Sequence, residues 1–193
     1  MATMVKPMTI LERHGAKLEA METAERNVLR AAVAWAPAGR AATEARARFT
    51  GAEGKLVAAQ AALDGGLHKI SLADRELADS LRQLGAAGLT REAVGEGGGA
   101  MISDVLQAAA GVQKGEKGAT AARSAASSAA GASSAAWRDV LVAYDSLREA
   151  APDADFRSVA ALFGRDGITT GPPADAEGVE KAVRERLTTM GSK

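Results

Sequence analysis

Residues 111–136 read GVQKGEKGATAARSAASSAAGASSAA, and this stretch decides the fold that we predict. Alternating steps of four and three residues separate its members Gly111, Gly115, Gly118, Ala122, Ala125, Ala129, Ala132 and Ala136. This spacing places small side chains along one face of an α-helix, where another helix can approach closely. The alternation continues to Val140, so we expect one long helix over residues 101–150.

A flexible linker is the alternative for residues 108–136, because Gly, Ala and Ser dominate their composition. The helix is favoured because the phase of the alternation never slips and Ala is the best helix former. The early glycines, from Gly111 to Gly118, are the positions where such a helix is weakest.

A second seam lies upstream and keeps the steps of three and four over three heptads. Its members are Ala42, Ala45, Phe49, Ala52, Leu56, Ala59 and Leu63. Pro37 and Gly39 before this seam, and Gly65 and Gly66 after it, predict the two ends of its helix.

The rest of the N-terminal half predicts two more helices and a loop. A capping box at Thr9–Glu12 starts a helix that we expect to run to Ala36. A further helix is expected over 67–84, so residues 1–84 would form a three-helix segment, a hairpin plus a third helix. The glycines of residues 85–100 predict a loop or hinge.

Residues 151–193 predict short helices and a tail, because Pro152 ends the long helix. Asp153 or Asp155 is expected to cap a short helix that ends at Phe163. Asp175 is expected to cap a last helix, whose inner face would carry Val179, Val183, Leu187 and Met190. The predicted fold class is all-α, an elongated helical bundle of hairpins with Ala-rich, coiled-coil-like seams and a small helical C-terminal appendage.

The composition agrees with helices that pack through alanine. The chain has 46 Ala, whereas Leu, Ile, Val and Phe together make up 35 of 193 residues. Their share is below the roughly 20% that marks a well-cored globule. A disordered chain typically combines such a shortage of large apolar residues with a high net charge, but here 24 basic residues balance 24 acidic ones.

The same numbers exclude several functional classes. A balanced charge without a basic stripe argues against nucleic acid as a partner. The chain has no Cys, and its most apolar stretch, residues 28–36, contains Arg30 and is too short to cross a bilayer. The first twenty residues lack the apolar run of a signal peptide. We therefore expect a soluble protein that is cytoplasmic or lies within a particle assembled inside the cell.

No catalytic, cofactor-binding or metal-binding site is predicted. Residues 95–100 fit the spacing G-x-G-x-x-A of a dinucleotide loop, but no strand precedes them, so we interpret them as a connector. His14 and His68 have no second ligand at helical spacing. The large aromatic residues Trp35, Trp137 and Tyr144 are candidate interface anchors, and packing anchors within the chain are the alternative for the two tryptophans.

Trp35-Ala36-Pro37 lies at a predicted turn between two helices, and in this it resembles the small secreted helical hairpins of the WXG type. The resemblance covers about residues 9–63. Pro37 stands where that family has glycine, and Arg148 stands where its export signal has an acid. We therefore assign no family on this basis.

These features predict a non-enzymatic structural protein. A seam of alanine buries little area per turn. At roughly 25 cal/mol per Å² of buried apolar area, its hydrophobic gain barely offsets the backbone entropy lost on folding, which is about 1 to 2 kcal/mol per residue. Association with copies of itself or with other structural proteins would extend the buried seam. We expect a component of a virion, tail, scaffold or filament; the alternative is a helical adaptor or regulator that binds one partner protein.

Ala129→Leu tests the predicted seam. The larger side chain stands where two helix axes are expected to approach, so the variant should unfold at a lower temperature or change its oligomeric state. Circular dichroism, melting temperature and mass in solution measure these effects. If all three stay unchanged, Ala129 does not lie in a packed seam.

Overall fold

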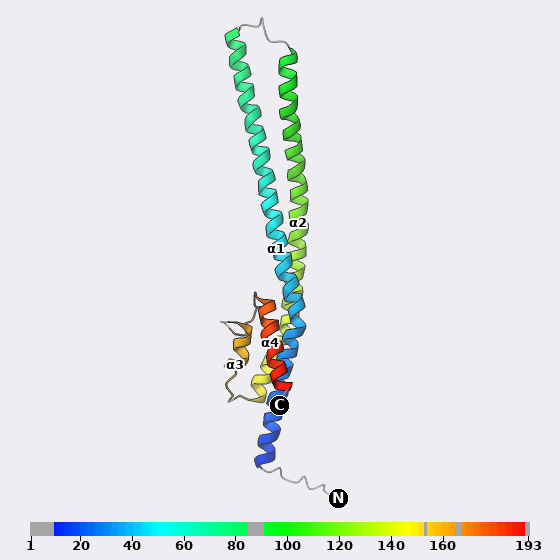
Figure 1. The fold of residues 1–193 in the computed structure, drawn as a ribbon, viewed down its shortest axis with the longest axis vertical. Coiled ribbons are helices and arrows are strands. Elements are labelled where there is room, and N and C mark those ends of the chain that lie inside the picture. Colours follow the sequence, from blue (N-terminus) through cyan, green and yellow to red (C-terminus); the bar gives the residue numbers. More distant parts are fainter. Residues whose placement is uncertain (1–9, 85–90, 153, 165–166, 192–193) are drawn as a thin grey trace. The chain divides into compact units, whose positions relative to one another are not determined.

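A computed structural model describes residues 10–84, 91–152, 154–164 and 167–191. These residues contain helices and no strand, so the predicted all-α fold class is confirmed (Figure 1). The elements are α1 (Ile10–Leu84), α2 (Arg91–Ala150), α3 (Arg157–Ala160), the 3-10 turn η1 (Ala161–Phe163) and α4 (Ala176–Gly191).

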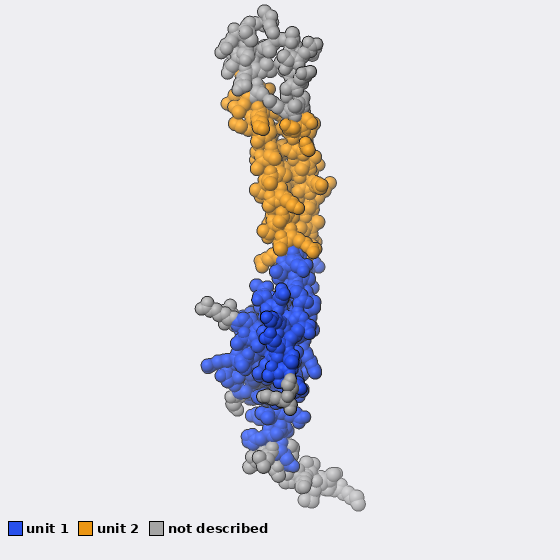
Figure 2. All heavy atoms as spheres, in the orientation of Figure 1, with its two compact units in different colours: residues 1–45, 127–193 blue, residues 46–126 orange. Residues whose placement is uncertain are grey.

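The chain divides into two compact units (Figure 2). Unit 1 consists of residues 1–45 and 127–193, and unit 2 consists of residues 46–126. The long helices α1 and α2 each contribute residues to both units, whereas α3, η1 and α4 belong to unit 1.

The three N-terminal helices that we predicted are one continuous helix, α1, and the predicted end at Pro37 is wrong. A proline inside a helix costs about 3 kcal/mol. The side chains just before Pro37, among them Trp35 and Ala36, are fully buried. Burying one large apolar side chain contributes roughly 1.5 to 3 kcal/mol, so packing around Val28–Ala36 outweighs the proline.

The predicted end at Gly65 and Gly66 is also wrong. Each glycine costs only about 1 kcal/mol relative to Ala, which does not end a helix that packs against a neighbour. Such a neighbour is present, because a Cβ placed on Gly66 would lie 2.8 Å from Val105 Cγ2 of α2. Here glycine allows the two helices to approach.

The long helix predicted over 101–150 is confirmed, and the linker alternative for 108–136 is wrong. The predicted loop at 85–100 needs correction, since α2 begins at Arg91 and includes residues 91–100; residues 85–90 lie outside the described part of the chain. An established helix adds one hydrogen bond per residue, so moderate glycine penalties do not end it.

The core of unit 1 is built around two tryptophans. Trp35 of α1 and Trp137 of α2 are 0% and 1% exposed, and their ring centroids lie 5.0 Å apart in an edge-to-face arrangement. The ring of Phe163 lies 5.7 Å from that of Trp137. Helices α1 and α2 and the C-terminal segment therefore meet at one aromatic cluster.

Helix α4 packs on this core, a contact that the sequence left undecided, and it does so through the apolar face that the sequence predicted. The backbone N–H of Gly178 donates to Asp175 Oδ1 at 2.8 Å, which is the expected cap. Val179 and Val183 are buried, and Leu187 and Met190 are partly buried against the core.

Two ion pairs join α4 to α1. Glu25 pairs with Arg186 at 2.9 Å, and Arg40 pairs with Glu180. Before α4, the N-cap residue of the short helix is Phe156, which makes no side-chain cap hydrogen bond, so the predicted cap at Asp155 is wrong. Asp155 lies one residue earlier, where its Oδ1 accepts from the backbone N–H of Arg157 at 3.0 Å; Asp153 lies outside the described residues. This helix consists of α3 and η1 and ends at Phe163 as expected.

Unit 2 is an antiparallel hairpin of α1 and α2. Leu56 faces Gly115, with its Cα 3.3 Å from the place of a Cβ on that glycine, and Ala59 faces Gly111 in the same register. Arg123 lies over the ring of Phe49, 5.4 Å from its centroid, and pairs with Glu53 at 3.9 Å. The side chains between the two helices are therefore small or only partly covered.

Gly39→Ala should destabilise unit 1. A Cβ on Gly39 would lie 2.7 Å from both Ala176 Cβ and Trp35 Cζ2, so α1 and α4 would have to separate. We expect a loss of about 1 to 3 kcal/mol in the free energy of unfolding. Gly54→Ala is the control, because nothing lies within 4 Å of its added Cβ. It should stabilise the helix by up to about 1 kcal/mol. Urea unfolding of both variants measures the contrast, and equal stabilities would contradict the close approach at Gly39.

Candidate interaction surfaces

The structure places the α1 seam as the spacing predicted. All seven predicted residues, from Ala42 to Leu63, are half-buried, and every other residue from 41 to 63 is exposed. Phe49 and Leu56 identify the inward face, because charged residues such as Arg48 and Lys55 precede them on the outside. Large apolar residues fix the phase of a heptad pattern.

Six of the nine predicted residues of the α2 seam lie on the packed face of the helix. Its predicted members Gly111, Gly115, Ala122, Ala129, Ala136 and Val140 are half-buried or buried. The remaining three, Gly118, Ala125 and Ala132, are exposed. Their places on the inner face are taken by the next residues along the chain, Ala119, Ala126 and Ser133. Small residues occupy both alternatives, so only the position of the neighbouring helix decides between them.

The two tryptophans are packing anchors within the chain, which is one of the two alternatives that the sequence left open. Both lie inside unit 1, where Trp35 Nε1 donates to Ser133 Oγ at 3.1 Å and Trp137 Nε1 donates to the carbonyl of Thr169 at 2.9 Å. Burial of both rings within one chain leaves neither free for a partner. Tyr144 is half-buried, with its ring 6.5 Å from that of Phe156.

Ser133 is a residue whose role the sequence reasoning missed. Its side chain is buried and accepts the hydrogen bond of Trp35. A serine at a seam position that otherwise holds Ala is the signal that could have identified it, because a buried hydroxyl needs a partner.

The glycines of residues 95–100 belong to α2, so their backbone is helical and does not form the loop that a dinucleotide site requires. His14 and His68 are exposed. Among the described residues, no group of three or more His, Asp or Glu side chains could hold a metal ion. In the same part of the chain, no helix combines the length and apolar character needed to cross a membrane.

Two grooves lie between the helices of unit 2. One has a volume of about 580 Å³, and its floor is formed by Ala52 and the glycines Gly51, Gly111, Gly115 and Gly118. Its rim carries three cations, Arg48, Lys55 and Lys114.

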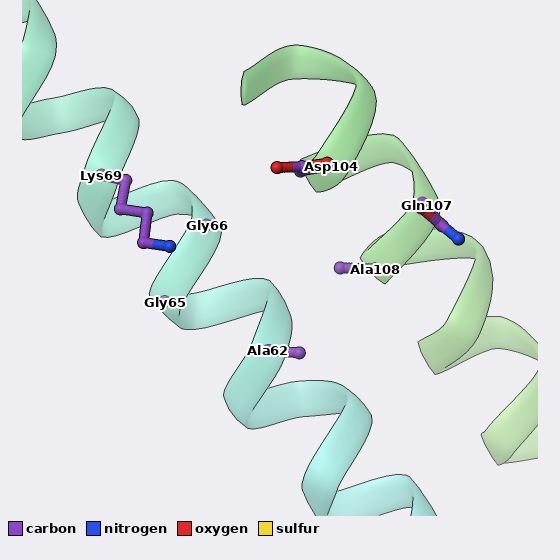
Figure 3. Close-up of a pocket in the computed structure, with 7 residues that line it drawn as sticks. All are labelled: Ala62, Gly65, Gly66, Lys69, Asp104, Gln107 and Ala108. Atoms are coloured by element: carbon purple, nitrogen blue, oxygen red, sulfur yellow. The ribbon is translucent and has the colours of Figure 1, made fainter. Parts of the chain in front are cut away.

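The second groove, of about 530 Å³, has a floor of small residues that includes Gly65 and Gly66 (Figure 3). At its rim, the side chains of Lys69 and Asp104 extend from α1 and α2 over this open floor. Both grooves are therefore hollow because the residues beneath them have almost no side chains.

Large apolar side chains are exposed elsewhere in unit 2. Val57 is 63% exposed and Leu106 is 65% exposed, and Leu67 and Leu72 are also exposed. Unit 2 therefore offers both hollows lined by small residues and projecting apolar groups. These are the two complementary parts of a helix-packing contact.

No protein-family model, curated protein or solved structure matches this chain.

Ser133→Ala should destabilise unit 1. The variant removes the acceptor of a buried indole N–H, and leaving such a donor without a partner costs about 1 to 3 kcal/mol. Ser134→Ala is the matched control, because Ser134 is exposed on the same helix. Chemical unfolding should give a clearly lower free energy for the first variant and an almost unchanged value for the second. Identical values would mean that the Trp35–Ser133 bond contributes nothing.

Proposed function

We propose that this chain is a non-enzymatic structural protein that associates with copies of itself or with other subunits of one assembly. The assembly is of the virion, tail, scaffold or filament kind. The contacts are made by unit 2, through faces of its helices that are rich in Ala and Gly.

One observation carries this proposal. Among the described residues of unit 2, Ala119 is the only buried hydrophobic residue, whereas the other fourteen buried hydrophobic residues of the structure belong to unit 1. A two-helix hairpin covers one face of each helix and leaves the others in water. Unit 2 therefore has a seam but no core of its own.

The energetics favour further burial on this hairpin. Ordering the backbone costs about 1 to 2 kcal/mol per residue, and Ala and Gly recover little of this by hydrophobic burial at roughly 25 cal/mol per Å². Covering Val57 and Leu106 would add apolar burial that one chain does not make. A partner that packs against unit 2 supplies it.

The second candidate is an adaptor that binds one partner protein through the same hairpin. The observation in its favour is the cationic rim of the glycine-floored groove, which suits an acidic helix. The two candidates differ in whether the chain binds itself.

Size-exclusion chromatography with light scattering on the full chain separates them. Self-association predicts a mass above the 19.6 kDa of one chain that increases with concentration. A mass that stays at one chain up to millimolar concentration contradicts self-association. In that case, isolation from the native source discriminates: a single stoichiometric partner supports the adaptor, and several structural subunits support the assembly.

A further inference from the structure

The two broad faces of the unit 2 hairpin differ in shape, since one has two grooves and the other has projecting apolar side chains. We call the face that carries both grooves the grooved face. Successive residues of an α-helix are about 100° apart, so a residue two positions beyond a groove residue points about 200° away from it. Val57 stands two residues beyond the groove residue Lys55, and Leu106 stands two residues beyond the groove residue Asp104. Both exposed apolar side chains therefore lie on the opposite face, which we call the knobbed face.

The two faces also differ in charge. The grooved face has four cations, Arg48, Lys55, Lys69 and Lys114, and one carboxylate, Asp104.

The knobbed face carries Asp64 and Glu116, which stand two residues beyond the groove residues Ala62 and Lys114. It also holds the Glu53–Arg123 pair, whose charges cancel, and Arg46, which stands two residues before the groove residue Arg48. Counted over these residues, the knobbed face carries one net negative charge.

These charges are not compensated within the chain. Among the described residues, Lys55, Lys69 and Lys114 form no ion pair, and neither do Asp64 and Glu116. Opposite potentials on two faces of one chain favour contact between copies and fix their orientation.

We propose, building on the function above, that the grooved face of one copy receives the knobbed face of a second copy. Val57 and Leu106 enter the glycine-floored hollows, and Asp64 and Glu116 meet the lysines at the rim. Because the two faces in contact are different, a pair of bound copies still has one grooved face and one knobbed face free. Such a heterologous contact repeats and builds a ring or a filament.

The size of the grooved face suits this contact. The groove residues of α1 run from 48 to 69, which is about 32 Å of helix at 1.5 Å per residue. Two helices of about 10 Å diameter make the face roughly 20 Å wide, so its projected area is on the order of 600 Å². This is close to the ~800 Å² per partner of a standard protein interface.

Gly51→Leu tests the hollow without disturbing the hairpin. Nothing lies within 4 Å of a Cβ on Gly51, so the chain should fold as before, while the leucine fills the groove. Gly54→Leu is the matched control, since Gly54 is equally open on the same helix but lines neither groove. Sedimentation velocity should show at least tenfold weaker association for Gly51→Leu and wild-type association for Gly54→Leu, with unchanged circular dichroism for both.

The results separate this inference from the proposed function. If the wild-type chain associates and both variants associate equally well, or both lose association, the grooved face is not the contact, but structural self-association stands. If the wild-type chain is monomeric, both ideas of self-contact are overturned.

A charge exchange tests the pairing of the two faces. The double variant Lys55→Glu with Lys114→Glu and the double variant Asp64→Lys with Glu116→Lys should each associate at least tenfold more weakly than wild type at low salt. Mixing the two variants should restore association, because an acidic groove then meets a basic knobbed face. Wild-type association of either variant alone, or a mixture that stays dissociated, overturns the pairing.

Discussion

The edge-to-face contact of Trp35 with Trp137 is the interaction on which unit 1 depends. The chain has only two tryptophans, and both lie in this one cluster. Each indole N–H also donates to a different part of the fold. Trp35 donates to Ser133 of α2, and Trp137 donates to the carbonyl of Thr169, which precedes α4. The pair therefore joins α1 to α2 and joins the C-terminal segment to both. It also explains why α1 continues through Pro37, since the helix that carries Trp35 is held from several sides.

Unit 2 has no comparable anchor. Its largest inward residues, Phe49 and Leu56, are only half-buried, and the ring of Phe49 is covered by the guanidinium of Arg123. Regions with few buried apolar contacts open at a lower free energy than the core of the same protein. Unit 1 therefore contains the packed core, whereas unit 2 presents surfaces whose burial is incomplete in one chain.

The sequence predicted the inward face of a helix most accurately where large apolar residues stand among small or charged ones. The α1 seam was placed correctly because Phe49, Leu56 and Leu63 stand out among charged neighbours. In α2, Ala125 and Ala126 are equally small, so periodicity could not say which one faces inward. The helix ends at Pro37 and Gly66 failed for another reason, since local penalties of a few kcal/mol are decided by packing that only the folded chain reveals. The grooves could not be predicted, because they arise from the register of two helices distant in sequence.

The glycines of unit 2 fall into two groups. Gly66 and Gly115 are explained by the fold, because a Cβ on either would press against Val105 or Leu56. Gly51, Gly65 and Gly118 are not, since a Cβ on each would meet nothing within 4 Å, and Ala would stabilise the helix by about 1 kcal/mol at each position. All three line the grooves. Gly54 is equally open and lines neither groove, so three of the four open glycines among the described residues of unit 2 lie on the grooved face, and this excess fits a contact made there with something outside the chain.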